Sequence, residues 1–260
     1  MALLDPAART ALGAKTRADL TGRPAPEPAT LLDASWRDYV YAEIWSRPAL
    51  DLRARFLISL GGAAGAGDTE AAERYAHGAL HTGHLTLAEL REAALQTAVY
   101  AGWSCGQLLD NAVTAAAGTL GLAGAPCPAI RAAPWDPAVR LTEGQANFAT
   151  VMGFGGPAPK TAYYGAGIAN FVFGEMWMRP GLDQRARRWL TLVGVCNSSS
   201  SIPIRSHIWA AMASGNATVE EMHEFVLQYA VHGGWPRGSV AQAAVIEQAD
   251  RVARGLAFEI

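Results

Sequence analysis

The three cysteines are the first residues whose chemistry can be judged from spacing alone. Cys105, Cys127 and Cys196 are odd in number, lie far apart and form no Cys-x-x-Cys pair. A disulfide framework needs paired thiols, and a dithiol redox site needs two neighbouring ones. We therefore interpret them as reduced thiols and expect a cytoplasmic protein.

Three histidines follow a spacing that metal sites use. His77, His81 and His84 stand at i, i+4 and i+7, which places them on one face of a helix. No acidic or thiol ligand with matching spacing accompanies them. A solvated histidine face is therefore favoured, and no metal site is expected.

Composition excludes several classes of protein. The 260 residues are 50% hydrophobic and 17% charged, with a net charge of −2. This is enough apolar material for a sizeable core, and it predicts no basic face for nucleic acid or for an anionic membrane. Apolar stretches are interrupted before the ~18 residues that a membrane span needs. The N-terminus also lacks the regions of a signal peptide, so a soluble, cytoplasmic protein is expected.

The second half of the chain repeats the first. The segment from Glu43 to Gly106 aligns without a gap on the segment from Glu175 to Gly238, and 23 of the 64 aligned positions are identical. We call the shift that carries position 43 to position 175 the repeat offset. We therefore predict two copies of one unit, packed about a pseudo-twofold axis.

Both copies carry the local signals of helices. Asp51 and Asp183 are placed as N-caps, each three residues after a proline. A Thr-x-x-Glu capping box begins at Thr86 and again at Thr218, and apolar residues then recur at helical spacing. Strand-type alternation is scarce, so the predicted fold class is all-α.

Composition shifts divide the chain into four predicted parts. Residues 1–35 form an N-terminal arm with an extended, proline-marked stretch, and residues 36–115 form the first repeat. Residues 116–160 form a connector rich in glycine, alanine and proline, with a short helix expected from Thr142 to Val151. Residues 161–260 form the second repeat.

Two motifs of the second repeat carry a family resemblance. One is Trp-x-Arg-Pro-Gly-Leu-Asp-x-x-x-Arg from Trp177 to Arg187; the other is His-x-x-x-Ala at His207, eight residues before a Gly-x-x-Thr-x-Glu-Glu that ends at Glu221. Together they resemble the carboxymuconolactone decarboxylase family, within the alkylhydroperoxidase D-like superfamily. The resemblance covers about residues 36–115 and 168–250. It implies an all-helical, cofactor-free homo-oligomer, and two repeats per chain favour a trimer.

Members of the peroxidase branch of this superfamily typically carry the motif Cys-x-x-Cys-x-x-x-His. Counted back from the histidine position, its cysteines fall on Ser200 and Pro203 in the second repeat and on Asp68 and Ala71 in the first. Neither repeat has a thiol there, so disulfide turnover at that position is impossible. The sequence therefore predicts that the protein is not a thiol peroxidase.

The decarboxylase branch keeps the histidine without the cysteines, as the second repeat does. The first repeat has Tyr75 at the position of His207, and the relay glutamate of the peroxidase branch is replaced by Phe56 and Arg188. We therefore expect one competent site per chain, in the second repeat, and a degenerate site in the first.

The resemblance implies a chemistry for the catalytic candidates His207, Glu175 and Arg187. Loss of CO2 from a carboxylated lactone leaves an enolate that must be held and protonated. His207 is suited to deliver the proton. Glu175 could orient it, and Arg187 or Arg188 could bind a remote carboxylate or the developing enolate, because a cation on the departing carboxylate would oppose its loss.

Each of these candidate residues could instead have a purely structural role. His207 could be a satisfied helix histidine, and Glu175, repeated as Glu43, could pair with an arginine such as Arg179. The duplicated arginines could form surface ion pairs, which contribute little. Trp177, also duplicated, is more typical of packing than of substrate contact.

Five residues are the candidates for substrate binding. The serines from Ser198 to Ser201 lack the glycines of a nucleophile elbow and are expected to form a polar loop that caps the next helix. Ser200, close to the lost cysteine positions, could still donate a hydrogen bond in the pocket. The full set is Arg188, Ser200, Trp177, His232 and Trp235.

We expect a cofactor-independent decarboxylase or lyase that acts on a carboxylated lactone or vinylogous β-keto acid through an enolate. An isomerase or cyclase that uses the same site on a secondary-metabolite intermediate is the first alternative. The second is a non-catalytic oligomer that binds a small carboxylic acid or lactone. A cavity that holds His207 favours the enzyme.

Overall fold

The computed structural model describes residues 4–124, 127–131 and 136–259. The described chain is helical and contains no strand, which confirms the all-α prediction. The helices are α1 (Pro6–Thr21), α2 (Leu31–Ser35), the π-helical η1 (Trp36–Trp45), α3 (Leu52–Ala66), α4 (Thr69–His81), α5 (Leu87–Ala101), α6 (Trp103–Thr119), α7 (Pro137–Met152), the π-helical η2 (Tyr163–Phe173), the 3-10 turn η3 (Met176–Met178), α8 (Gln184–Ser198), α9 (Ser201–Ala213), α10 (Val219–Gly233) and α11 (Trp235–Ala253). No helix of the described chain is long and apolar enough to cross a membrane.

Capping side chains set where the central helices begin. The Asp51 carboxylate accepts a hydrogen bond from the backbone N–H of Ala54, and the Asp183 carboxylate accepts one from Ala186, both at 2.8 Å. The capping boxes at Thr86 and Thr218 form as predicted. The bounds of α8, α9 and α10 are those of α3, α4 and α5 moved by the repeat offset.

The arm and the connector are more helical than the sequence predicted. The arm contains the 16-residue α1. The helix expected in the connector from Thr142 to Val151 is present, and as α7 it runs over 16 residues from Pro137 to Met152. Both helices begin at the proline of an Asp-Pro pair, with Asp5 and Asp136 as N-caps, and both end at a left-handed glycine, Gly22 and Gly153. Residues 1–3, 125–126 and 132–135 of these segments lie outside the described residues.

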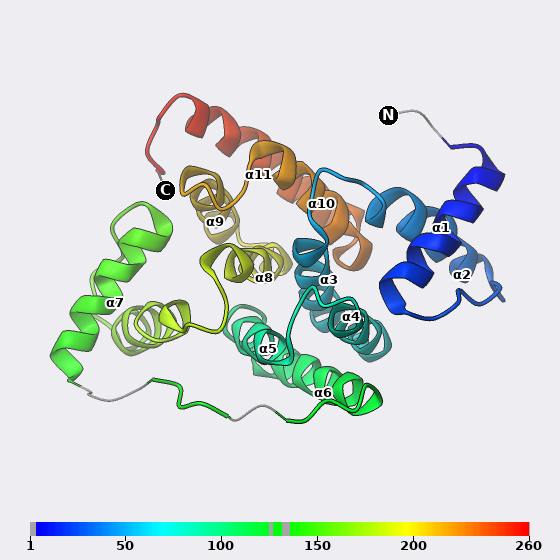
Figure 1. Cartoon of the computed structure of the whole chain (residues 1–260). Helices are drawn as coiled ribbons and strands as arrows, with labels where there is room; N and C mark the ends of the chain where they lie inside the picture. The colour runs from blue at the N-terminus through cyan, green and yellow to red at the C-terminus, as the bar shows by residue number, and fades with distance from the viewer. Residues whose placement is uncertain (1–3, 125–126, 132–135, 260) are drawn as a thin grey trace.

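The two helices occupy opposite sides of the molecule (Figure 1). Each crosses its π-helical neighbour at a glycine. A Cβ on Gly13 would lie 1.9 Å from the carbonyl oxygen of Arg37, and a Cβ on Gly144 would lie 1.8 Å from that of Ala169. A side chain at either position would therefore push the two backbones apart.

The two halves of the chain interlock at the centre. Helix α5 packs on α8, and α10 packs on α3, so each half contributes a helix to the other half's core. Buried ion pairs tie these helices together: Arg55 contacts Glu224 at 2.8 Å, and Arg187 contacts Glu92 at 3.0 Å. The two pairs are equivalent, because Arg55 aligns with Arg187 and Glu92 aligns with Glu224.

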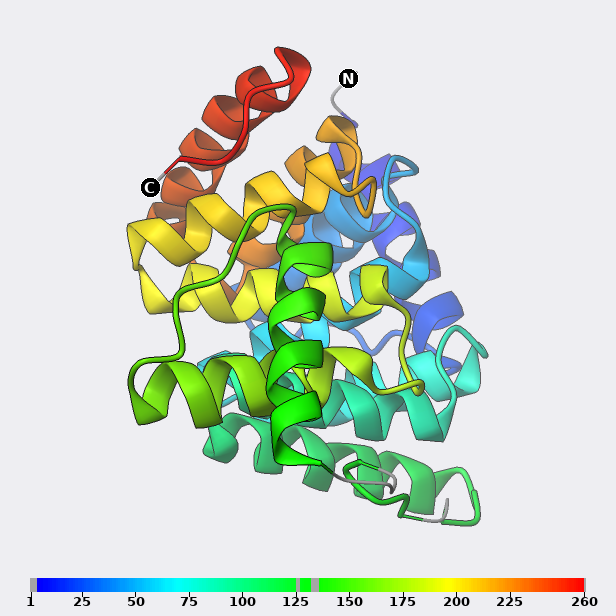
Figure 2. The same ribbon diagram turned by 90° about the vertical axis from the view of Figure 1, so that its left-hand side faces the viewer.

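A second, smaller apolar cluster lies under α7. Figure 2 shows α7 crossing in front of η2, α8 and α9. In this cluster, Val151 and Met152 of α7 itself pack with Phe173, Trp177 and Trp209. This cluster forms part of the wall around the candidate site.

Candidate active site

A cavity of about 740 Å³ opens between α7, η2, α8 and α9. Its wall includes the aromatic rings of Phe148, Phe154, Phe173 and Phe258, and none of the described residues that line it carries a charge. We call it the aromatic cavity. Its volume lies within the range of small-molecule sites, and its few polar groups include the side chain of His207.

His207 projects from α9 into the wall of this cavity and is only 8% exposed. Its Nδ1 lies 3.3 Å from Nη1 of Arg188. A guanidinium can only donate hydrogen bonds, so Nδ1 must accept, and the single ring proton of the neutral imidazole lies on Nε2. His207 is therefore fixed as an Nε2–H donor.

Burial and the neighbouring cation keep His207 neutral. Desolvation and the charge of Arg188 lower the pKa of His207 to about 3. Desolvation also lowers the pKa of Arg188, to about 10, which leaves it charged at neutral pH. The pair thus presents a neutral imidazole with a positive charge directly behind it.

Arg188 is held by uncharged partners. Its Nη2 donates to the carbonyl oxygen of Val151 at 2.6 Å, and its guanidinium lies 4.9 Å from the ring centroid of Trp177. No carboxylate of the described chain forms an ion pair with it. An unneutralised buried cation is costly, and such groups often mark functional sites.

Tyr100 reaches the aromatic cavity from α5, in the other half of the chain. Its ring meets that of His207 edge-on, with centroids 5.4 Å apart, and its hydroxyl accepts a hydrogen bond from Nε1 of Trp177 at 2.8 Å. Burial raises the pKa of Tyr100 to about 12, so the phenol keeps its proton. The sequence prediction did not place Tyr100 in the site. One available clue was that Tyr100 aligns with His232 at the repeat offset.

Two predicted catalytic residues lie outside the cavity wall. Glu175 is buried in an ion pair with Arg140 of α7. Glu175 thus pairs with an arginine, as its structural interpretation allowed, but Arg179, the example named for that pairing, donates to Glu92 at 2.9 Å. Arg187 also binds Glu92, so its guanidinium is engaged in the interface between the halves.

Of the residues predicted to bind substrate, some lie at the aromatic cavity and others lie away from it. Ser200 lies on the cavity wall, and Trp177 supports Tyr100 from behind. His232 lies elsewhere: its Nε2 is 3.1 Å from the hydroxyl of Tyr75. Trp235 is 56% exposed and packs on an outer surface. The structure therefore brings together His207, Arg188, Trp177 and Ser200 from the predicted set.

The described residues include no group of three or more histidine, cysteine, aspartate or glutamate side chains placed to hold a metal ion. The polar groups on the aromatic cavity wall are hydroxyls and one imidazole. They can donate hydrogen bonds to an uncharged carbonyl or to an enolate oxygen.

Comparison with known proteins supports the family resemblance. No protein-family model matches the sequence. The chain is 30% identical to the 4-carboxymuconolactone decarboxylase of Acinetobacter baylyi over 74 residues, which are 28% of this chain and 54% of that protein. It is 33% identical to a nitrosuccinic acid decarboxylase of Metarhizium robertsii over 81 residues, 31% of this chain and 54% of that one. The chain thus spans about half the length of these curated relatives. Both are named as decarboxylases, which supports an enzyme of decarboxylase type.

Proposed function

We propose that the protein is a cofactor-independent decarboxylase whose reaction takes place in the aromatic cavity. The observation that carries this proposal is the neutral His207, backed by Arg188, on the wall of a cavity with no charged lining. The substrate class is a carboxylated lactone or a vinylogous β-keto acid.

The uncharged wall favours loss of CO2. A carboxylate is destabilised when such a cavity removes its water of hydration. The transition state is destabilised less, because its charge is spread into a conjugated carbonyl. An arginine on the departing carboxylate would oppose the reaction, and none lines the wall. Arg188 instead lies behind His207, where its charge stabilises the enolate oxygen.

His207 performs two steps in this mechanism. The bond to the carboxyl carbon breaks, its electron pair enters the carbonyl system, and Nε2–H donates a hydrogen bond to the resulting enolate oxygen. The same proton then passes to carbon, and the charge left on the ring is held by Arg188 until solvent returns a proton. The ring of Tyr100, edge-on to the imidazole and held by Trp177, fixes the orientation of His207 toward the substrate.

We propose one active site per chain, in a molecule of two units related by a pseudo-twofold axis. Equal helix bounds and reciprocal ion pairs at the repeat offset support the axis. In the first unit Tyr75 and Phe56 replace His207 and Arg188. The family resemblance and the two repeats per chain further favour a homotrimer, and the unpaired cysteines favour a cytoplasmic location.

Release of CO2 and loss of ultraviolet absorbance with 4-carboxymuconolactone test this function, with nitrosuccinic acid as a second substrate. Turnover by the native chain and its loss in His207→Gln are expected. Substrate consumption that depends on His207 without CO2 release would favour the isomerase or cyclase. Binding without consumption would favour the non-catalytic alternative.

A further inference from the structure

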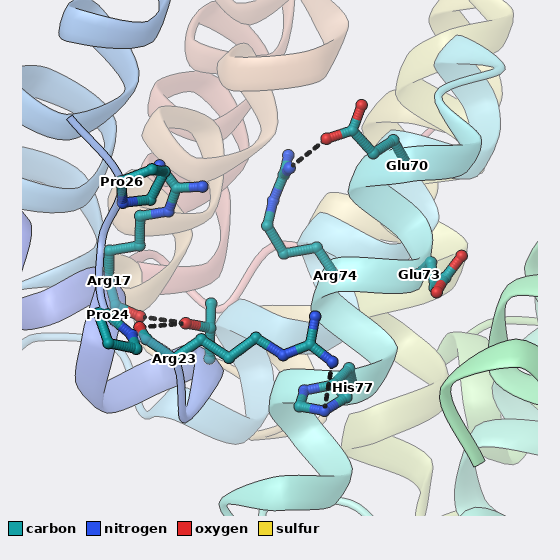
Figure 3. Close-up of a pocket in the computed structure, with 9 residues that line it drawn as sticks. Arg17, Arg23, Pro24, Pro26, Glu70, Glu73, Arg74 and His77 are labelled. Atoms are coloured by element: carbon teal, nitrogen blue, oxygen red, sulfur yellow. Dashed lines mark hydrogen bonds and ion pairs between the residues drawn. The ribbon is translucent and has the colours of Figure 1, made fainter. Parts of the chain in front are cut away.

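A second cavity, of about 400 Å³, lies between α1, the segment that follows it and α4 (Figure 3). It lies in the first half of the chain, away from the aromatic cavity. Charged and titratable side chains dominate its wall. They are Arg17, Arg23, Arg74, His77, Glu70 and Glu73. We call it the arginine cavity.

The arginine cavity is the counterpart of the aromatic cavity on the side of α1. Helices α1 and α7 have the same length and the same caps, and they align from Pro6 on Pro137, one position short of the repeat offset. In this alignment Arg17 corresponds to Phe148, and Arg23 corresponds to Phe154. Both phenylalanines line the aromatic cavity, so two apolar walls have become cationic.

The wall of the arginine cavity that α4 forms also has charged residues in place of uncharged ones. Helices α4 and α9 match at the repeat offset, where Glu70 corresponds to Ile202 and Arg74 to Ser206. Ile202 and Ser206 also line the aromatic cavity. The first half thus keeps a cavity at the corresponding place, with its chemistry changed from apolar to charged.

The unbalanced charge in this cavity is positive. Arg74 is paired with Glu70 at 3.1 Å, and the Glu73 side chain points away from the arginines in Figure 3. Arg17 and Arg23 form no ion pair within the described chain. Arg17 lies over the ring of Tyr41 at 5.8 Å, and a Nη2 atom of Arg23 reaches to 3.4 Å from Nε2 of His77. Two guanidinium groups therefore keep donors free for an anion.

The lowered pKa of His77 agrees with a net positive charge in the arginine cavity. Burial, Arg23 and His81 together hold the pKa of His77 below its usual value. The ring of His81 stacks on that of His77, with centroids 6.0 Å apart. A bound anion would offset this accumulation of donors and positive charge.

Trp36 separates the arginine cavity from the degenerate catalytic position. It corresponds to Ile168 of the aromatic cavity, and its larger ring lies 5.8 Å from that of His232 and 5.7 Å from the guanidinium of Arg74. Tyr75 behind it is 2% exposed. A ligand in the arginine cavity therefore meets arginines and not the Tyr75–His232 pair, which favours binding over chemistry.

We propose that the arginine cavity is a second ligand site that binds the oxyanion group of a small molecule, a carboxylate or a phosphate, through Arg17 and Arg23. Guanidinium groups recognise both kinds of oxyanion through paired N–H donors. This site is independent of turnover in the aromatic cavity.

Calorimetric titration of the full chain with succinate and, separately, with inorganic phosphate tests this site. The native chain is expected to bind at least one of them, and the tighter probe identifies the oxyanion. Arg17→Phe, which installs the counterpart residue, and Arg23→Gln, at an exposed position, are each expected to weaken binding at least ten-fold. Lys15→Ala, an exposed change on the same helix, removes an equal charge and should leave the affinity unchanged.

Imidazole NMR signals locate the bound anion. The His77 signal is expected to shift during the titration, while that of the remote His223 stays in place. Absence of binding by both probes would overturn the proposal. Equal affinity in Arg17→Phe, Arg23→Gln and the native chain would also overturn it, because the anion would then lie elsewhere.

Discussion

The contact between Arg188 and His207 decides what the imidazole can do. In water an imidazole gains a proton near neutral pH and donates it as a cation. Here burial of the ring, together with the guanidinium 3.3 Å from Nδ1, prevents that protonation and leaves Nε2–H as the donor. The first half has neither group, since Tyr75 and Phe56 occupy the two positions.

The rate of decarboxylation should therefore not follow the pKa of an ordinary histidine. The pKa of His207 is lowered to about 3, and that of Arg188 to about 10. We expect kcat to be constant between about pH 5.5 and 8.5 and to fall as pH rises toward 10, where Arg188 loses its proton. Steady-state kinetics across this range check the prediction. An inflection near pH 6.5 would contradict it.

The candidate site was partly predictable at the residue scale. His207, Arg188 and Ser200 follow from motif positions that are local in sequence. Tyr100 does not, because it reaches the cavity only through the packing of α5 on α8. The position of Glu175 was not predictable, because its partner, Arg140, lies on a part of α7 that the sequence did not predict to be helical.

At the scale of elements, the crossing of α7 over η2 shapes the aromatic cavity. The crossing depends on Gly144, whose missing side chain lets α7 approach the carbonyl oxygen of Ala169. The equivalent crossing at Gly13 holds α1 against η1, beside the arginine cavity. Each glycine thus sets how closely a helix from the arm or connector approaches the central bundle.

Gly144→Ala should lower the thermal stability, because the new Cβ would meet that oxygen at 1.8 Å and α7 would have to move. The loss is expected to be about 1–3 kcal/mol, in the range of overpacked sites. Gly118→Ala in α6 is the matched control, since nothing lies within 4 Å of its Cβ. It should be neutral or raise stability by up to about 1 kcal/mol. Equal Tm changes for both variants would contradict the account.

The same elements mark the limit of prediction from sequence. Caps and apolar spacing correctly predicted where α5 and α10 begin. The equivalence of α1 and α7 escaped because their alignment is one position shorter than the repeat offset, so a gapless comparison does not match them. The contacts at Gly13 and Gly144 appear only when the helices are packed.

Across the whole molecule, two buried ion clusters join the halves. Glu92 contacts Arg179 and Arg187; burial opposes its charge, but the two guanidinium groups hold the pKa of Glu92 below its usual value. Glu224 lies in the equivalent cluster with Arg47 and Arg55. Each glutamate comes from one half, and its deeply buried arginine partner comes from the other.

Glu92→Gln should strongly destabilise the fold, since it leaves buried guanidinium charge without its counter-ion. A loss of about 3–5 kcal/mol in the free energy of unfolding is expected. The control is Arg254→Ala, which breaks an exposed pair with Asp250 and should cost at most about 0.5 kcal/mol. Urea denaturation of both variants makes the comparison. Similar midpoints for the two would refute a central role for the cluster.

Two buried histidines make the whole molecule sensitive to acid. Their pKa values are lowered by burial, that of His232 to about 4 and that of His207 to about 3. The unfolded chain binds protons near pH 6.5 and the folded chain does not, so stability falls as pH drops below 6.5. Each histidine contributes a slope approaching about 1.4 kcal/mol per pH unit. Urea unfolding at pH 7 and pH 5 should show a smaller loss for His232→Gln than for the native chain; an equal loss would contradict this.

Decarboxylation in D2O, with CO2 collected and the product examined by NMR, tests the central claim most directly. We expect CO2 release with one deuterium on the carbon of the enolate or dienolate that is protonated, because His207 exchanges its Nε2 proton with solvent. His207→Gln should lose at least about 100-fold in rate. CO2 release at an undiminished rate in that variant, or a product without the deuterium, would contradict the account.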